Sequence, residues 1–428
     1  MMLKITHLLI GLLILPLLPV IVRAQDSTLF PDLPGVVAYI GSDGNVYSLE
    51  FDTNTQAILT NDSEAGLPYL WPTWSTDGRL AYFRLIPVDG RPVTEVHISS
   101  DGLDSGEMVY AGRDEVVNYA YWSPQNCLTG PNCRDLAVLM SSRSANGLFI
   151  RLVQDQQGED TSRITSIGRP FYYSWSPDGT QMLWQRNQQR LDIYDVQSDA
   201  IVTTLDGVPG TFQAPGWSPV DDRWLVGILG ADSQSTDLAV ITVAGTRPLA
   251  SGLVGPVAFG WSPDGNYIAY TDNQGPLAIV DAVTGAVVAR SDTSGVFAFF
   301  WSPDSKHIAF LTLASPPNTF TTQADIGGFP AVPAFLQRIP EMAWSVLDIA
   351  DGAVRRYGFF TPTEEMLYLI AFFDQFAQSH RVWSPDSRFV IYSEDQGDVS
   401  FLNVIDVTQE NIVPFAVAEG VFGVWSFH

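Results

Sequence analysis

Three features of the sequence predict an all-β protein, an eight-bladed β-propeller with four strands in each blade. The phrase Trp-Ser-Pro-Asp-Gly, complete at Trp175 and Trp261, recurs in full or altered form along most of the chain. Successive copies lie 40 to 53 residues apart, except for one interval of 82 residues, and a Trp-marked repeat of this length is typical of a propeller blade. The two ends of the chain carry complementary parts of a single blade.

Eight copies of the phrase form the predicted structural repeat. Their tryptophans are Trp74, Trp122, Trp175, Trp217, Trp261, Trp301, Trp383 and Trp425. The phrase has the chemistry of a turn, since Pro presets φ at the second position, Asp tolerates the third, and Gly adopts a positive φ. We therefore interpret its Ser and Asp as turn residues rather than as a nucleophile and its acid.

Three short apolar runs follow a typical phrase. The clearest set is 268–270, 277–281 and 286–289, where the second run ends in Asp281. Such β-branched and aromatic runs, bounded by Gly, Asp and Pro, predict strands, and nothing in the repeat has the period of a helix pair.

The chain ends predict how the ring closes. Residues 36–60 have the three later strands of a blade but no Trp strand, whereas 420–427 have a Trp strand with nothing after it. We expect the C-terminal strand to join the N-terminal blade, which removes free sheet edges.

The 82-residue interval between Trp301 and Trp383 contains one set of strands, at 308–312, 343–348 and 353–359, rather than a ninth blade. The excess forms two insertions, 314–342 and 361–379. Thr361-Pro362-Thr363-Glu364 predicts a capping box for a helix over 366–376. In an up-and-down blade, both insertions belong to one face of the ring, and the loop after Trp122 belongs to the other.

Residues 1–24 read as a cleavable secretory signal, followed by a short linker over 25–35. A charged start precedes an apolar run from Leu8 to Val22, and Val22-Arg23-Ala24 provides small residues at the cleavage positions. The alternative is that the run is retained as an anchor. No other stretch is long enough to cross a membrane, so we expect an exported protein, extracellular or periplasmic.

The net charge, the cysteines and the histidines indicate which partners, bonds and metal sites to expect. With 22 basic and 47 acidic residues, the net charge of −25 argues against nucleic acid as a partner. Cys127 and Cys133 are the only cysteines, and in an exported chain we expect them to form a disulfide worth about 2 kcal/mol. A zinc site needs further ligands, and His97, His307 and His380 are interpreted as surface or packing residues, so no metal or cofactor is expected.

The phrase Trp-Ser-Pro-Asp-Gly, followed by Ile-Ala-Tyr, an Asp-ended strand and Thr-Gly, resembles the TolB-type repeat. Related repeats occur in the propellers of prolyl oligopeptidase and dipeptidyl peptidase relatives. The resemblance covers almost all of residues 36–427 and implies the fold. TolB has an α/β domain before its propeller and the peptidases have an α/β-hydrolase domain, and this sequence contains neither pattern.

For function, the sequence favours a non-catalytic scaffold that binds a protein or a glycan of the cell envelope, acting as a monomer. The candidate partner surface is formed by residues of the insertions, Phe320, Phe329, Phe335, Arg338, Tyr368, Phe372 and Phe373. The alternative for these aromatic residues is packing of the helix onto the ring. The alternative function is a propeller lyase or hydrolase with carboxylates in an axial channel.

Overall fold

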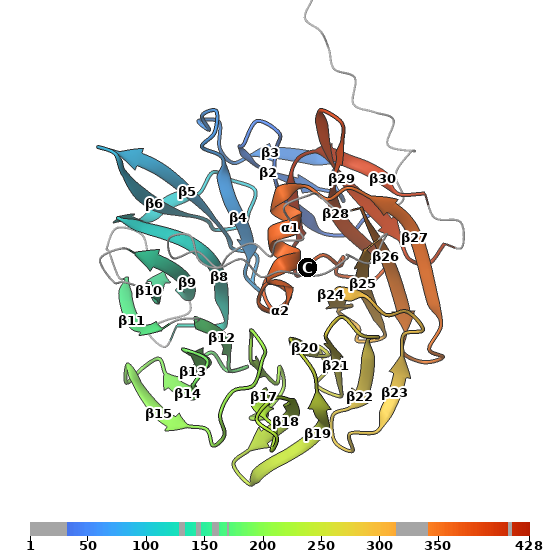
Figure 1. The fold of residues 1–428 in the computed structure, drawn as a ribbon. Coiled ribbons are helices and arrows are strands. Elements are labelled where there is room, and N and C mark those ends of the chain that lie inside the picture. The colour runs from blue at the N-terminus through green and yellow to red at the C-terminus, as the bar shows by residue number, and fades with distance from the viewer. Residues whose placement is uncertain are drawn as a thin grey trace, which may run out of the picture. The chain divides into compact units, whose positions relative to one another are not determined.

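The computed structural model describes residues 32–127, 133–142, 147–155, 162–168, 171–313, 341–409 and 413–428, without the side chains of 166–168 and 171. Residues Leu33–His428 form one compact unit. In this unit, eight antiparallel sheets follow one another around a ring (Figure 1). Seven sheets have four strands and one has three. The predicted all-β, eight-bladed propeller is therefore confirmed.

The blades follow the chain in order. After the first blade they consist of β4 (Tyr69–Trp74), β5 (Leu80–Val88), β6 (Arg91–Ser99) and β7 (Glu107–Arg113); β8 (Glu115–Asn126), β9 (Arg134–Ser142), β10 (Gly147–Gln154) and β11 (Arg163–Gly168); β12 (Phe171–Trp175), β13 (Gln181–Arg186), β14 (Arg190–Asp195) and β15 (Ala200–Thr204); β16 (Gly216–Trp217), β17 (Trp224–Leu229), β18 (Thr236–Thr242) and β19 (Gly245–Leu253); β20 (Val257–Trp261), β21 (Tyr267–Asp272), β22 (Ala278–Asp281) and β23 (Val287–Arg290); β24 (Val296–Trp301), β25 (His307–Leu313), β26 (Met342–Asp348) and β27 (Val354–Phe360); and β28 (Phe389–Gln396), β29 (Val399–Asp406) and β30 (Phe415–Glu419).

The C-terminal strand closes the ring as predicted. β31 (Phe422–Trp425) pairs antiparallel with β1 (Val36–Ile40), which is followed by β2 (Val46–Glu50) and β3 (Thr55–Ile58). The Val36 N–H also donates to Ser426 Oγ at 3.0 Å. The first blade therefore combines the two ends of the described chain.

The three-stranded blade has an irregular innermost strand. Trp383 forms a bridge with Val390 of β28, and Arg381 forms one with Trp425 of the neighbouring blade. The segment at Trp383 therefore holds the place that a full Trp strand holds in the other blades.

Most tryptophans of the repeat make the same hydrogen bond, from the indole N–H to a carbonyl of the preceding blade. The Trp261 indole N–H donates to the carbonyl of Gly216, the residue before Trp217 in the preceding blade, at 3.1 Å. The same bond from the indole to the preceding blade is made by Trp74, Trp122, Trp175, Trp301 and Trp383. Trp217 instead donates to Asp221 in its own altered turn. Six of the eight tryptophans thus join neighbouring blades.

The Ser and Asp of the phrase bond within the turn. Ser262 Oγ donates to Asp264 Oδ1 at 2.6 Å and accepts from the Tyr267 N–H at 2.9 Å, and Gly265 has φ +70°. Burial opposes ionisation of Asp264, but hydrogen bonds from Ser262 and Asn266 hold its pKa below the ordinary value. Equivalent Ser-to-Asp bonds occur in the turns after Trp74, Trp175, Trp301 and Trp383. This geometry accounts for these residues as turn formers.

The first insertion lies between the second and third strands of one blade. β25 pairs directly with β26, and Leu313 lies opposite Met342, so the three predicted strands of this interval belong to one blade rather than two. Residues 314–340 fall outside the described part of the chain.

The second insertion contains two helices, α1 (Glu364–Ala371) and α2 (Phe373–Phe376). The predicted capping box is wrong: the N-cap is Thr363, whose hydroxyl accepts from the Met366 N–H at 3.2 Å. The reason is that Pro362 forms a β-bridge with Glu394, which keeps the chain extended up to Thr363. Among the described residues, no helix has the length and apolar character needed to cross a membrane.

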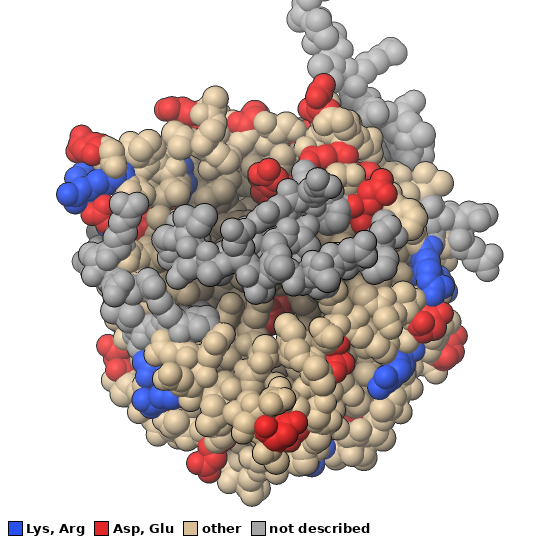
Figure 2. All heavy atoms as spheres, in the orientation of Figure 1, with Lys and Arg blue, Asp and Glu red and all other residues tan. Residues whose placement is uncertain are grey.

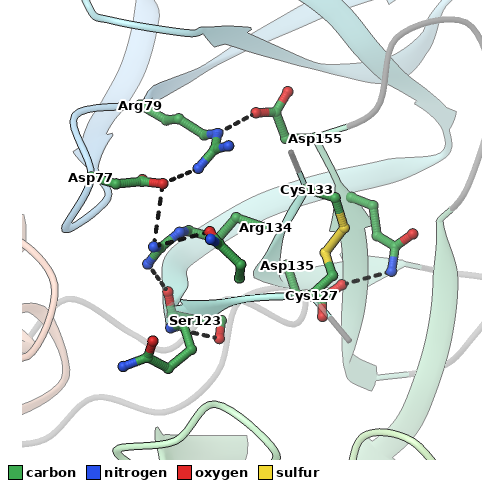
Figure 3. The surroundings of a disulfide bond; sticks show 11 residues. Asp77, Arg79, Ser123, Cys127, Cys133, Arg134, Asp135 and Asp155 are labelled. Atoms are coloured by element: carbon green, nitrogen blue, oxygen red, sulfur yellow. Dashed lines mark hydrogen bonds and ion pairs between the residues drawn. A yellow bond between two sulfur atoms is a disulfide. The ribbon is translucent and has the colours of Figure 1, made fainter. Parts of the chain in front are cut away.

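The predicted disulfide between Cys127 and Cys133 is present, with a Cα–Cα distance of 5.4 Å (Figure 3). It lies beside an ion-pair network in which Arg79 Nε contacts Asp155 at 2.7 Å and Arg134 contacts Asp77 at 3.3 Å. The network links β9 to the turn after Trp74, so this loop is tied to the preceding blade.

Candidate functional site

Residues 361–380, which we call the plug, lie at the centre of the ring (Figure 1). Gln375 pairs with the backbone of Tyr173 through two hydrogen bonds of 3.1 and 2.9 Å. Its own carbonyl accepts from the Tyr119 hydroxyl at 2.9 Å, and Gln378 donates to the Pro215 carbonyl at 3.3 Å. The plug is therefore bonded to the innermost segments of three successive blades.

Aromatic contacts fix the plug from other directions. The Trp71 ring lies 4.8 Å from that of Tyr368 and 5.3 Å from that of Phe376. Phe373 meets Phe299 of β24 at 5.1 Å. Together with the hydrogen bonds, these contacts make the plug part of the core of the ring.

The structure places the candidate partner residues in two groups. Phe320, Phe329, Phe335 and Arg338 lie outside the described residues, so their role as a partner surface stays a prediction. Tyr368 is half-buried, and Phe372 and Phe373 are only 8% and 7% exposed. Phe372 and Phe373 thus pack against their own chain, as in the alternative interpretation of these residues, and their part in a partner surface stays a prediction.

A cavity of about 570 Å³ lies between the plug and the Trp-Ser-Pro turns of most blades; we call it the axial cavity. Its wall is mainly aromatic and Pro side chains from the ends of the innermost strands, among them Trp175, Trp217, Trp261 and Trp301. Concave sites of this volume, lined by aromatic side chains together with polar groups, are typical of ligand-binding pockets.

Among the described residues that line the axial cavity, Asp374 is the one carboxylate. Burial raises its pKa to about 6, although hydrogen bonds from the backbone N–H groups of Ala214 and Gln375 act in the opposite direction. Both carboxylate oxygens are therefore already occupied by backbone donors.

Arg381 and Tyr121 bring a positive charge and a hydroxyl to the same cavity. The Arg381 guanidinium lies 3.9 Å from the centroid of the Phe427 ring, and burial lowers its pKa to about 10. Burial raises the pKa of Tyr121 to about 12, and the charge of Arg381 partly opposes this shift. The cavity wall thus presents both a cationic group and a phenol hydroxyl.

His380 and His97, two of the histidines that the sequence predicts to pack, lie in different parts of the ring. His380 is 1% exposed, contacts Thr73 and Ser379 through its ring nitrogens at 3.1 and 2.7 Å, and has a pKa lowered by burial to about 3. His97 stacks on Tyr82 in another blade. In the described part of the chain, no three His, Cys, Asp or Glu side chains gather to hold a metal ion.

Sequence reasoning missed Asp374, Arg381 and Tyr121 as cavity residues. A usable signal existed for Arg381, which lies two residues before Trp383. At that position the other seven copies have Pro, Ala, Tyr, Phe or Gly, so Arg381 is the only charged residue there. Asp374 is likewise the only charged residue in the helical run 366–376, where Gln375 follows it.

The fold and this site define a β-propeller with an axial cavity of ligand size. No protein-family model matches the chain, and no curated protein matches it in sequence. Among solved structures, it is similar to the crystal structure of the eukaryotic initiation factor, with 12% identity and a TM-score of 0.52, covering 92% of this chain and 98% of that one. This likeness shows the fold alone.

Two further structures share less of the geometry. TolB from Acinetobacter baumannii has 14% identity and a TM-score of 0.37, over 80% of this chain and 81% of that chain. The β-propeller domain of Cps50 (Swd1) from Myceliophteria thermophila has 16% identity and a TM-score of 0.43, over 64% of this chain and 89% of that chain. Neither likeness carries an argument about function.

Proposed function

We propose that this protein is an exported, non-catalytic binding propeller that takes a protein or glycan group into the axial cavity. The supporting observation is the cavity itself, which combines an aromatic wall with charged groups at the plug. The disulfide between Cys127 and Cys133 supports export, since such bonds persist in oxidising compartments. A binding site on the insertion face remains the alternative location.

The charge distribution fits a soluble binding protein rather than a strongly steering surface. Figure 2 shows Asp and Glu side chains scattered over the face that it draws, with Lys and Arg towards the edge. We therefore place specificity in the axial cavity and assign the net charge of −25 to solubility.

Asp374 favours a second candidate function, a lyase or hydrolase. A carboxyl group with a pKa of about 6 in a cavity is suited to general acid or base work. Glycoside hydrolysis uses a pair of carboxylates, and among the described residues that line the cavity Asp374 has no such partner. Binding is therefore the function that the geometry supports best.

The experiment blocks the cavity and asks what binding is lost. Gly260 lines the cavity, and a Cβ added there meets only Phe299 at 3.7 Å, so Gly260→Leu projects new volume into the site at little local strain. Gly358→Leu on β27 is the matched control, because a Cβ there meets nothing within 4 Å. A library of metabolites, oligosaccharides and peptides is screened by thermal shift.

We expect at least one compound class to raise the melting temperature of wild type and of Gly358→Leu, but not that of Gly260→Leu. If no compound separates the two variants, the axial cavity is not the binding site. Turnover of a compound that depends on Asp374 would instead support the enzyme.

A further inference from the structure

Arg381 brings a partly buried positive charge to the axial cavity. No side-chain hydrogen bond or ion pair joins it to any described residue, and the guanidinium lies 3.9 Å from the centroid of the Phe427 ring. Partial withdrawal from water weakens the hydration of a guanidinium, and an anion or hydrogen-bond acceptors of a ligand can replace what is lost. The bonds that it does not make within the chain are therefore available to a ligand.

The other described arginines show how unusual this is. Most of them pair with a carboxylate. Of those that do not, Arg247 and Arg355 donate to backbone carbonyls, and Arg290 is exposed to solvent. In a chain with 47 acidic residues, a cavity-lining arginine left without a carboxylate is a marked exception.

Asp374 does not supply the missing anion. Its two oxygens accept from the Ala214 and Gln375 N–H groups, and no ion pair joins it to Arg381. The Tyr121 hydroxyl, whose pKa is affected by the Arg381 charge, also makes no hydrogen bond with a described residue. Two donors in one cavity thus lack acceptors.

We propose that the axial cavity binds an organic carboxylate on an apolar or aromatic body, held by the Arg381 guanidinium and the Tyr121 hydroxyl. A guanidinium matches a carboxylate with two parallel hydrogen bonds, and a phenol adds a third donor. The aromatic wall receives the apolar body. This inference rests on the proposed function, since it names the chemical group that the cavity recognises.

The test compares phenylacetate with phenylacetamide, which has the same shape without the charge, and with glucuronate, a carboxylate on a polar sugar ring. Dissociation constants are measured by calorimetry or ligand-observed NMR at pH 7.5 and low salt. We expect wild type to bind phenylacetate at least about tenfold more tightly than phenylacetamide or glucuronate.

Arg381→Gln is expected to reduce phenylacetate binding to within about twofold of phenylacetamide binding while leaving the latter unchanged. Tyr121→Phe, which preserves the ring, provides a second variant with a loss of a few-fold should Arg381→Gln not fold. Arg356→Gln, at an exposed ion pair with Asp292, is the matched control and should bind like wild type.

Absence of phenylacetate binding, equal binding of phenylacetate and phenylacetamide, or discrimination that survives Arg381→Gln would overturn the inference. If glucuronate bound as tightly as phenylacetate, the inference that the ligand has an apolar or aromatic body would be wrong. A lower melting temperature of Arg381→Gln with unchanged discrimination would mean that Arg381 only stacks on Phe427. If Gly260→Leu abolishes binding of library compounds but none depends on Arg381, the proposed function stands and this inference fails.

Discussion

At the scale of single residues, indole N–H groups connect one blade to the next. The bonds of Trp74, Trp122 and Trp383 are buried, so loss of one of them leaves a carbonyl without its donor away from water. Trp425 differs, because its indole nitrogen is buried without an acceptor among the described residues. Comparing the two kinds of tryptophan therefore separates the contribution of the hydrogen bond to stability from that of the buried ring.

The first prediction compares Trp383, whose indole makes the bond, with Trp425, whose indole does not. Trp383→Phe should lower the free energy of unfolding by about 2 to 4 kcal/mol, since it removes both ring volume and the bond to the Phe300 carbonyl. Trp425→Phe removes similar volume from an equally buried site but no bond, and should cost about 1 kcal/mol less. Chemical denaturation measures both; equal losses would show that the bond contributes nothing.

At the scale of elements, the plug carries the titratable groups that respond to pH. His380 has a folded pKa of about 3 against an ordinary value of 6.5, so the folded state disfavours its protonation. Neutral His380 therefore makes its full contribution to the free energy of unfolding above pH 6.5, and this contribution is lost as the pH falls towards 3. Asp374 acts in the opposite sense, because its raised pKa favours the protonated folded state below pH 6.

We therefore predict that wild type loses stability relative to His380→Gln on acidification. Between pH 7.5 and 5 the difference in unfolding free energy should shift by about 2 kcal/mol in favour of the variant, at roughly 1.4 kcal/mol for each pH unit below 6.5. Asp374 is present in both proteins, so its pH-dependent contribution to the unfolding free energy cancels in the difference. Denaturant titrations at a series of pH values check this, and a difference that stays constant with pH would contradict it.

The two insertions should respond differently to replacement. Leu313 and Met342 are paired, so Asn-Gly in place of residues 314–341 can close β25 and β26 as a tight hairpin. We expect this variant to keep the β signature in circular dichroism and its melting transition. Replacing 364–376 by a Gly-Asn turn should instead prevent folding, because it removes buried Met366, Ile370 and Phe376 from the core.

The first variant also decides between two binding surfaces. Ligand capture by the axial cavity should survive replacement of 314–341. Loss of capture from a folded variant would return the binding site to the insertion face, where the aromatic residues of that segment were predicted to act.

At the scale of the whole ring, stability depends on closure. β31 pairs with β1, and the Val424 carbonyl accepts from the Trp74 indole of the following blade at 3.3 Å. The Val421 carbonyl also accepts from the N-cap residue Thr363 of the plug at 2.6 Å. One short strand therefore joins the first blade, the second blade and the plug.

Deleting residues 421–428 should lower the melting temperature by roughly 10 °C or more, since buried Phe422, Val424 and Trp425 are lost. The edge of β1 that it exposes should also promote aggregation, which light scattering detects. Deletion of His428 alone is the control: this exposed residue contacts the Thr76 carbonyl through its ring at 2.6 Å, and its loss should lower the melting temperature far less. A protein without β31 that melts like the full chain would contradict closure by this strand.

The sequence by itself determined the repeat, and with it the eight blades, the closing strand, the disulfide and the place of the insertions. These follow from local patterns that recur, since Trp-Ser-Pro-Asp-Gly specifies its own turn through Ser262 and Asp264. The tertiary structure alone decided that the second insertion enters the ring axis, that Phe372 and Phe373 are covered, and that Arg381 meets Tyr121 in one cavity. Such contacts join residues up to hundreds of positions apart, so no local pattern encodes them, and only the closed ring brings their innermost strands together.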